Sequence, residues 1–283
     1  MNPGETLSCV TTDDKNLPGI FWRSADERAV IAVIHGLGEH SRRYAALAAK
    51  ANTLGFSVLA ADLRGHGLAA GLRCYVDHFD DYVLDARAIV ATARARAEGK
   101  PLFLLGHSMG GAIALRFLEL MPEWRAPLAG IVFSSPAVSI GPGISPFLLK
   151  LLPLVARIAP RLRVTALNPK LISRVAEQVV AYEADTLVAH RPPPLRTAHG
   201  LIAAMATFMP TARHLKLPMY VFHGDADALT SCEGSRTLYQ NWGGADKVLR
   251  VWPGSYHEVL NDSDGDAAAA EVLAWLEVQR NKV

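Results

Sequence analysis

Residues 102–115 read Leu-Phe-Leu-Leu-Gly-His-Ser-Met-Gly-Gly-Ala-Ile-Ala-Leu. The first four residues predict a buried strand and the last four begin a helix, so the Gly-x-Ser-x-Gly pentapeptide lies at the junction of the two. A serine at such a tight turn is lifted clear of the backbone, and bulky side chains in place of Gly106 or Gly110 would crowd it. A glycine-rich turn with an incidental serine is the alternative, but the flanking elements favour Ser108 as a nucleophile.

Strand-like and helix-like segments alternate on both sides of this turn. Apolar runs predict strands at 7–10, 20–23, Ala29–Ile34, Phe56–Ala61, 102–105, Leu128–Ser134, 219–222 and 248–251. Alanine-rich or three- and four-spaced apolar patterns predict helices at 42–54, 79–93, 112–121 and around 272–279. The first two strands indicate an antiparallel hairpin. Strands that alternate with helices predict an open, mostly parallel α/β sheet.

Length and composition indicate one large domain that carries an insertion. The chain has 283 residues, half of them hydrophobic, which is ample for a substantial core. A net charge of +2 and the lack of any zinc-finger or Walker-type motif give no reason to expect nucleic acid as a partner. Three scattered cysteines, a polar start and no apolar run of membrane-spanning length lead us to expect a cytoplasmic protein.

The strand–helix rhythm breaks after Pro136 for about eighty residues. We therefore divide the chain into a core of residues 1–135 and 215–283 and a helical cap of residues 136–214. From 136 to 215 the local charge is +6, which leaves −4 for the rest, and residues 147–155 are rich in leucine. Two interpretations stay open. The cap is either a lid that meets a lipid surface or membrane at its periphery, or a helical layer whose apolar face is buried on the core below.

A serine nucleophile needs a base, and the base needs a carboxylate that fixes its tautomer. Where a serine follows a strand in this way, the acid and then the histidine come later in the chain. The strand at 219–222 leads into His223-Gly-Asp-Ala-Asp227, in which two aspartates compete. We choose Asp227 as the acid and expect Asp225 to cap the turn through its own backbone. His223, at the strand end, is expected to make a satisfied hydrogen bond.

The base and the oxyanion donors are also predicted from loops that follow strands of the sheet. His257 lies on the loop after the strand at 248–251, beside the loop that carries the acid. The oxyanion of an acyl-transfer intermediate is held by the N–H that follows the nucleophile, here Met109, and by one from an earlier strand-end loop. That loop is His35-Gly-Leu-Gly38, in which Leu37 is the expected donor and Gly36 allows close approach to the substrate.

No His, Cys, Asp or Glu cluster has the spacing of metal ligands, so we expect no metal. His107, next to the nucleophile, is expected to line the substrate pocket.

Four motifs together resemble the monoacylglycerol lipase and lysophospholipase-like branch of the serine α/β-hydrolases. They are His35-Gly-Leu-Gly-Glu-His-Ser-Arg-Arg-Tyr44, Asp62-Leu-Arg-Gly-His-Gly67, Gly106-His-Ser-Met-Gly-Gly111 and Ser255-Tyr-His-Glu258. The resemblance spans the core and is weakest in the cap. One departure is Leu68-Ala-Ala-Gly71, where the family commonly has a serine in the second position.

The resemblance implies an α/β-hydrolase fold, with an eight-stranded sheet flanked by helices and a cap, and ester hydrolysis without a cofactor. Carried over residue by residue, it gives Ser108, Asp227 and His257 the triad roles. It gives Leu37 and Met109 the oxyanion roles. It also implies that Tyr182 is a cap tyrosine that faces the glycerol of the substrate, and that His107 joins it there.

The sequence therefore predicts an enzyme that cleaves a small-molecule lipid ester with a single acyl chain, chiefly a monoacylglycerol. Within the same chemistry, a lysophospholipase, a general carboxylesterase or an acyl-thioesterase is the nearest alternative. A hydrolase fold that acts as a non-catalytic receptor is the alternative of another class. It is disfavoured because every triad residue type is present.

Overall fold

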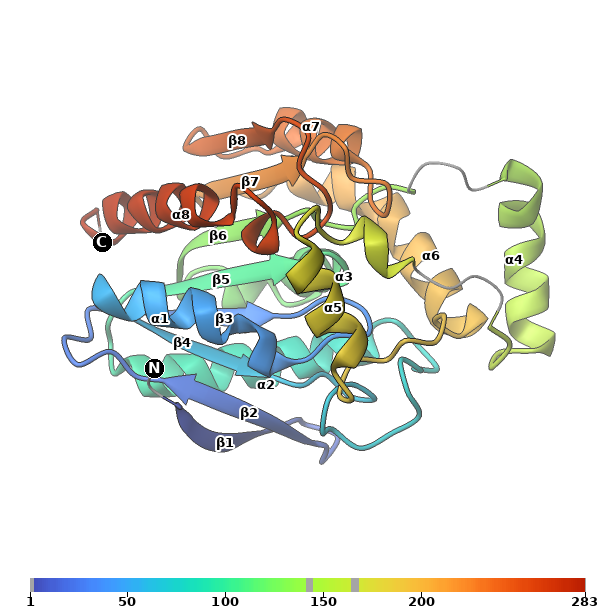
Figure 1. The fold of residues 1–283 in the computed structure, drawn as a ribbon, viewed down its shortest axis with the longest axis horizontal. Coiled ribbons are helices and arrows are strands. Elements are labelled where there is room, and N and C mark those ends of the chain that lie inside the picture. The colour runs from blue at the N-terminus through green and yellow to red at the C-terminus, as the bar shows by residue number, and fades with distance from the viewer. Residues whose placement is uncertain (1–2, 141–144, 164–167, 283) are drawn as a thin grey trace.

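The computed structural model describes residues 3–140, 145–163 and 168–282, and these residues form an eight-stranded sheet (Figure 1). The strands are β1 (Glu5–Val10), β2 (Asn16–Trp22), β3 (Ala29–Ile34), β4 (Phe56–Ala61), β5 (Leu102–His107), β6 (Leu128–Ser134), β7 (Met219–Gly224) and β8 (Lys247–Trp252). Their order in the sheet is β1-β2-β4-β3-β5-β6-β7-β8. The pairs β1–β2 and β2–β4 are antiparallel, and β3 to β8 run parallel to one another. The predicted open, mostly parallel sheet with a leading hairpin is confirmed.

The core is built on both faces of the central strands. All six residues of β3 are buried, and they alternate between two apolar clusters. Val30, Ala32 and Ile34 pack on the face covered by α2 (Asp81–Ala97) and α3 (Met109–Leu120). The alternate residues pack on the face covered by α1 (Ala45–Thr53) and α8 (Gly265–Arg280). A continuous apolar run is what a strand buried on two sides requires.

Several helices begin or end at residues that differ from the prediction. The helix predicted at 42–54 divides into the 3-10 helix η1 (Ser41–Tyr44) and α1. The helix after the serine starts at Met109, three residues earlier than predicted. Gly110 and Gly111 have poor helix propensity, so the pattern placed the start after them, whereas close packing against the sheet includes them in the helix.

Between β6 and β7 the described residues contain helices rather than strands. They are α4 (Pro146–Ile158), η3 (Pro169–Leu171), α5 (Ala176–Ala184) and α6 (Leu195–Ala212). Figure 1 shows that β5, β6 and β7 point toward the side where α5 and α6 lie. The remaining elements are η2 (Pro122–Trp124), α7 (Cys232–Asn241) and η4 (Val259–Asn261). None of the helices in the described ranges is long and apolar enough to cross a membrane.

Candidate active site

Ser108 lies between the end of β5 and the start of α3, in a backbone conformation that non-glycine residues rarely adopt (φ 53°, ψ −120°). Its N–H donates to the carbonyl of Ser134 (2.9 Å), which ties the turn to the neighbouring strand. A Cβ at Gly106 would lie 2.7 Å from the carbonyl oxygen of Gly110, and one at Gly110 would meet the carbonyl oxygens at the end of β3. The two glycines are therefore required by close packing.

The structure brings Asp227 and His257 together, although they lie 30 residues apart in the chain. Asp227 Oδ2 accepts from His257 Nδ1 at 2.7 Å, and both side chains are buried. Burial alone would raise the pKa of Asp227 and lower that of His257. The mutual attraction and the hydrogen bond outweigh burial, so the pKa of Asp227 is held far below its ordinary value and the pKa of His257 is raised.

Asp225 does not cap its own turn, contrary to the expectation from the sequence. Its Oδ1 accepts from the N–H of Gly254 at 2.6 Å, which joins its turn to the loop that carries His257, rather than capping its own backbone. The local turn is capped instead by Asp227, whose Oδ1 accepts from the N–H groups of Leu229 (2.7 Å) and Thr230 (3.0 Å). The expectation for Asp225 was wrong because the loop it meets lies about thirty residues further along the chain.

Leu37 lies on the loop after β3 and lines the same cavity as Ser108. Gly36 N–H turns back to the carboxylate of Glu39 (2.5 Å). Within the part of the chain that the structure describes, neither Leu37 N–H nor Met109 N–H donates to another protein group. Both residues line the cavity that also exposes Ser108. Two free donors beside a serine are the arrangement that an oxyanion requires.

This cavity gathers most of the residues that the sequence predicted. Ser108, His257, Leu37, Met109, Gly36, His107 and Tyr182 all line it. Asp227 lies behind His257 and is not part of the wall. The rest of the lining is mainly apolar and comes from α6 and from the loops after β6, η3 and β7, including Ile140, Ile172, Leu201, Ile202, Met205 and Leu229. A mainly apolar cavity with a few convergent polar groups is typical of a site for a small organic ligand.

His107 and Tyr182 are among the polar side chains that line the cavity. Nδ1 of His107 is 3.1 Å from both the carbonyl oxygen and the hydroxyl of Ser134, and its ring centre is 5.0 Å from that of His257. Burial lowers the pKa of His107, so the ring is neutral. Tyr182 comes from α5, and the guanidinium of Arg43 stacks over its ring at 5.0 Å.

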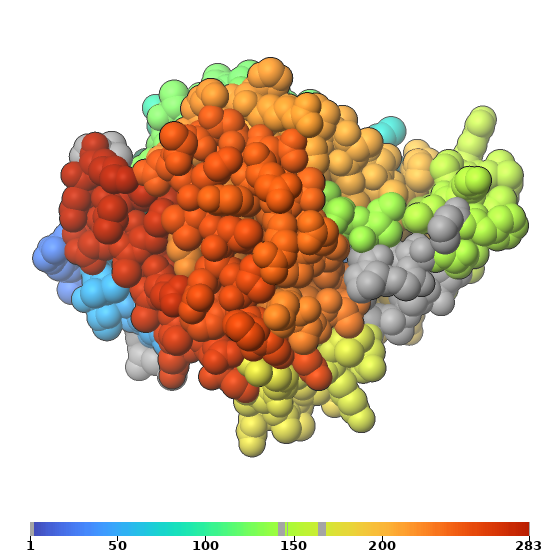
Figure 2. Space-filling model, turned by 90° about the horizontal axis from the view of Figure 1, so that it is seen from above, coloured from blue at the N-terminus to red at the C-terminus, as the bar shows by residue number. Residues whose placement is uncertain are grey.

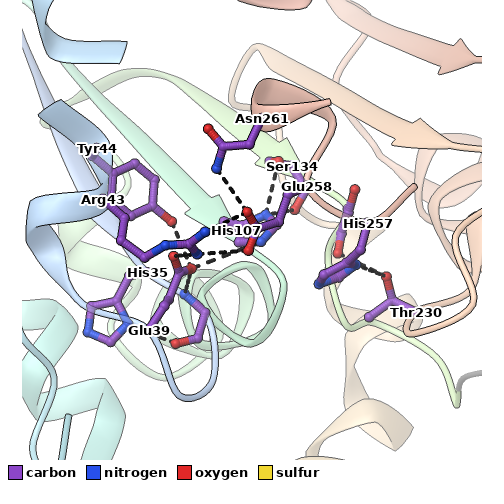
Figure 3. A network of polar contacts seen from close by, with 12 residues as sticks. His35, Glu39, Arg43, Tyr44, His107, Ser134, Thr230, His257, Glu258 and Asn261 are labelled. Atoms are coloured by element: carbon purple, nitrogen blue, oxygen red, sulfur yellow. Dashed lines mark hydrogen bonds and ion pairs between the residues drawn. The ribbon is translucent and has the colours of Figure 1, made fainter. Parts of the chain in front are cut away.

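A buried charge network beside the site was not foreseen (Figure 3). Arg43 donates to both carboxylate oxygens of Glu258 at 2.7 Å and to Glu39 at 2.9 Å, and all three side chains are nearly inaccessible. Asn261 donates to Glu258, and the hydroxyl of Tyr44 donates to Glu39. Glu39 and Arg43 stand in the first family motif and Glu258 follows the base, but 215 residues separate Arg43 from Glu258. No local pattern reveals such a pairing.

In the described ranges, no group of three or more His, Cys, Asp or Glu side chains is arranged to hold a metal ion.

Comparison with known proteins adds a family and named relatives. Residues 25–264 match the family described as serine aminopeptidase, S33. The monoacylglycerol lipase of Mycolicibacterium smegmatis is 35% identical over 258 residues, which cover 91% of this chain and 91% of that protein. The monoglyceride lipase of Mus musculus is 33% identical over 274 residues, covering 94% of this chain and 88% of that protein. The crystal structure of Paleococcus ferrophilus monoacylglycerol lipase is similar with a TM-score of 0.82 at 31% identity, covering 93% of this chain and 99% of that one.

Proposed function

This chain belongs to the serine aminopeptidase, S33 family of α/β-hydrolases, and from that membership we propose that it hydrolyses the single acyl ester of a monoacylglycerol to a fatty acid and glycerol. The family match and the named relatives confirm the resemblance noted in the sequence, the fold class and the assignment to the carboxylic-ester hydrolases. The roles of individual residues below are part of the proposal.

In the proposed reaction Ser108 Oγ attacks the ester carbonyl and His257 Nε2 takes its proton. Asp227 holds the opposite nitrogen of the ring at 2.7 Å and so keeps Nε2 free to accept. The N–H groups of Leu37 and Met109 stabilise the oxyanion. His257 then passes the proton to the leaving glycerol oxygen, and water releases the fatty acid by the same two steps.

The observation that carries the choice of substrate is the shape of the cavity over Ser108. It is lined mainly by aliphatic side chains and methionine, and its ionisable side chains, which include His107, Glu39 and Tyr182, lie close to one another. A molecule with one long apolar chain and a small polar alcohol fits that division. We assign His107 and Tyr182 to the glycerol end, and Gly36 to the close approach of the oxyanion loop.

The family description names an aminopeptidase, and the charges at this site favour an ester over a peptide. An aminopeptidase needs a carboxylate available to bind the ammonium group of its substrate. The acidic residues in the cavity wall are Glu39 and Glu258, and both are already bound to Arg43. Neither carboxylate is available for a second cation, which supports a neutral lipid substrate.

We also propose that α4 meets the lipid aggregate that supplies the substrate. Phe147, Leu148, Leu154 and Ile158 of this helix are 57–75% exposed, and Lys150 and Arg157 lie among them. Figure 2 shows α4 projecting from the body of the molecule. Exposed apolar side chains with basic neighbours suit the interface of a lipid surface. This supports the lid interpretation of the cap, residues 136–214, and action at the periphery of a lipid surface.

The test of the proposed function uses Ser108→Ala, with Ser8→Ala on exposed β1 as the matched control. We expect the first variant to lose ester turnover and fluorophosphonate labelling while its thermal unfolding stays nearly unchanged, and the control to keep both. Residual turnover by purified Ser108→Ala protein would refute the assignment.

The substrate is tested on wild-type enzyme with 1-monoacylglycerol, lysophosphatidylcholine and p-nitrophenyl esters of increasing chain length. We expect kcat/KM to rise with chain length, because each buried CH₂ contributes about 0.8 kcal/mol. We also expect the monoacylglycerol to be preferred. A preference for lysophosphatidylcholine or for the shortest esters would favour the lysophospholipase or the general carboxylesterase instead.

A further inference from the structure

The proposed catalytic carboxylate is shared by two histidines. Asp227 Oδ2 lies 2.7 Å from Nδ1 of His257 and 3.0 Å from Nε2 of His223, at the end of β7. The hydroxyl of Thr230 donates to the same oxygen at 2.8 Å. A triad requires only the first of these contacts, so the second imidazole is an addition that the mechanism above does not use.

The contacts of His223 determine its tautomer. An ionised carboxylate only accepts hydrogen bonds, so Nε2 of His223 carries the hydrogen that points to Asp227. Nδ1 lies 2.7 Å from the hydroxyl of Ser235, on α7, and in the neutral ring it accepts a hydrogen bond from that hydroxyl. The result is a buried line of donors that runs from Ser235 through His223 to Asp227, where it meets His257 from the other side.

The surroundings of His223 favour its neutral form. Its side chain is fully buried, and burial lowers its pKa despite the nearby carboxylate. The charged or titratable groups that face it are Asp227 and His257. A proton on His257 also disfavours a proton on His223, so the titrations of the two rings are coupled.

We propose that His223 is a positioning residue that sets the basicity of Asp227 that His257 needs, an inference that rests on the proposed function. His223 donates to Oδ2 as a neutral ring, while the N–H groups of Leu229 and Thr230 hold Oδ1, so the carboxylate keeps its place beside His257 when His223 is replaced. The bond from His223 draws charge from the carboxylate. Asp227 therefore pulls less strongly on the proton of His257, which leaves the base weaker and the proton easier to return to the leaving alcohol.

His223→Phe removes the donor and keeps an aromatic ring in the buried site. We expect kcat/KM on a soluble p-nitrophenyl ester to fall at least about tenfold, the loss that follows from one hydrogen bond to a charged group. We also expect the acid limb of the kcat/KM profile to move to higher pH by about half a unit or more, because the unrelieved carboxylate raises the pKa of His257. The other groups that face His257 are His107, Glu39 and Glu258, and this variant leaves them unchanged.

His223→Gln is the conservative variant, because its amide N–H can donate to Asp227 from nearly the same place. We expect it to recover most of the rate and to return the acid limb toward that of wild type. His66→Phe is the matched control, since His66 is also buried but its ring contacts are His35 and Tyr82. It should leave the acid limb in place. A His223→Phe enzyme with an unmoved acid limb, or a His223→Gln enzyme no better than His223→Phe, would overturn the proposal.

A measurement on wild-type protein does not depend on whether a variant folds. With ¹⁵N-labelled histidine, NMR should report His223 as the neutral Nε2–H tautomer throughout the titration of His257. A charged ring or the Nδ1–H tautomer would contradict the inference. Failure of the proposed function is separate, because it would appear as absent ester turnover in wild type or as full activity in Ser108→Ala.

Discussion

At the scale of single residues, Ser108 has a strained backbone conformation that the surrounding turn holds in place. Its positive φ is maintained because the turn is bound on both sides: its N–H bonds to Ser134, and its carbonyl accepts from Gly111 and Ala112. The position of the proposed catalytic carboxylate is equally specific. Asp227 and Asp225 differ by two positions, yet their carboxylates reach different loops, so their substitutions should have different effects.

Asp227→Asn should lower kcat by about 10⁴-fold, because the amide favours the wrong tautomer of His257. Asp225→Asn is the matched control. It weakens the bond to Gly254 N–H and should change kcat by less than about twofold. Steady-state rates on a soluble ester, with thermal unfolding of both variants, decide the matter. Equal losses in the two variants would contradict the choice of Asp227.

The pH dependence of the rate follows from His257. The attraction of Asp227 overcomes burial and raises the pKa of His257 above its ordinary 6.5. In the proposed mechanism the ring must be neutral to accept the proton of Ser108, so kcat/KM should be low in acid and rise as the pH passes an apparent pKa above 6.5. A pH–rate profile of the free enzyme checks this. An acid limb centred below 6.5 would show that burial wins.

At the scale of elements, the turn between β5 and α3 and the helix α4 represent two extremes. α3 begins where a Cβ on Gly110 would meet backbone carbonyls, so its place is determined by close contact with β3. α4 packs far less closely on the rest of the protein. Several of its largest side chains face solvent, and Ala156 is its one fully buried residue among those described. Exposed apolar surface of this kind marks a contact site, and the lipid aggregate proposed above is one partner that could cover it.

Replacing Phe147, Leu148 and Leu154 of α4 with serine should weaken binding to lipid vesicles by about a hundredfold. This takes roughly 1 kcal/mol for each side chain that becomes partly buried in the lipid. Because these side chains are exposed, thermal unfolding and kcat/KM on a soluble ester should stay unchanged. The measurement is co-sedimentation with phosphatidylcholine vesicles with and without anionic lipid. Val10→Ser with Val278→Ser, which removes two exposed valines from β1 and α8, is the control. Unaltered vesicle binding by the α4 variant would exclude this face as the contact.

At the scale of the whole molecule, Arg43 connects parts that are distant in the sequence. Through Glu39 it reaches the loop that carries Leu37, and through Glu258 it reaches the loop of His257; Figure 3 shows Arg43 between the two glutamates. Its guanidinium also covers the ring of Tyr182, on α5. One buried cation therefore stabilises the relative positions of three segments around the cavity. Buried charges of this kind are costly once a partner is removed.

Arg43→Met should lower the free energy of unfolding by about 3–5 kcal/mol, because it leaves two carboxylates buried without their counter-ion. The combined variant Glu39→Gln, Arg43→Met and Glu258→Gln should recover part of that loss, since no charge is then left unpaired. Arg96→Met, which breaks the exposed pair with Glu5, is the control and should change stability little. Urea denaturation compares the four proteins. A loss from Arg43→Met no greater than that of the control would contradict this account.

The sequence was sufficient to predict features that depend on residues close together in the chain. A buried strand appears in the sequence as an apolar run, which predicted the sheet. A serine turn needs small residues at fixed offsets, which predicted Ser108. The candidates Asp227 and His257 followed from their order after later strands. These features depend on neighbours within a few positions in the chain.

Only the tertiary structure decided which distant groups meet. The bond from Asp225 to Gly254, the second imidazole on Asp227 and the bridge from Arg43 to Glu258 join segments that the chain pattern treats as independent. The start of α3 at Met109 was set in the same way, by contact with β3 rather than by helix propensity. The reason is that hydrogen bonds and buried charges act over a few ångströms, and which groups come within that range is determined by the packing of the sheet and its loops.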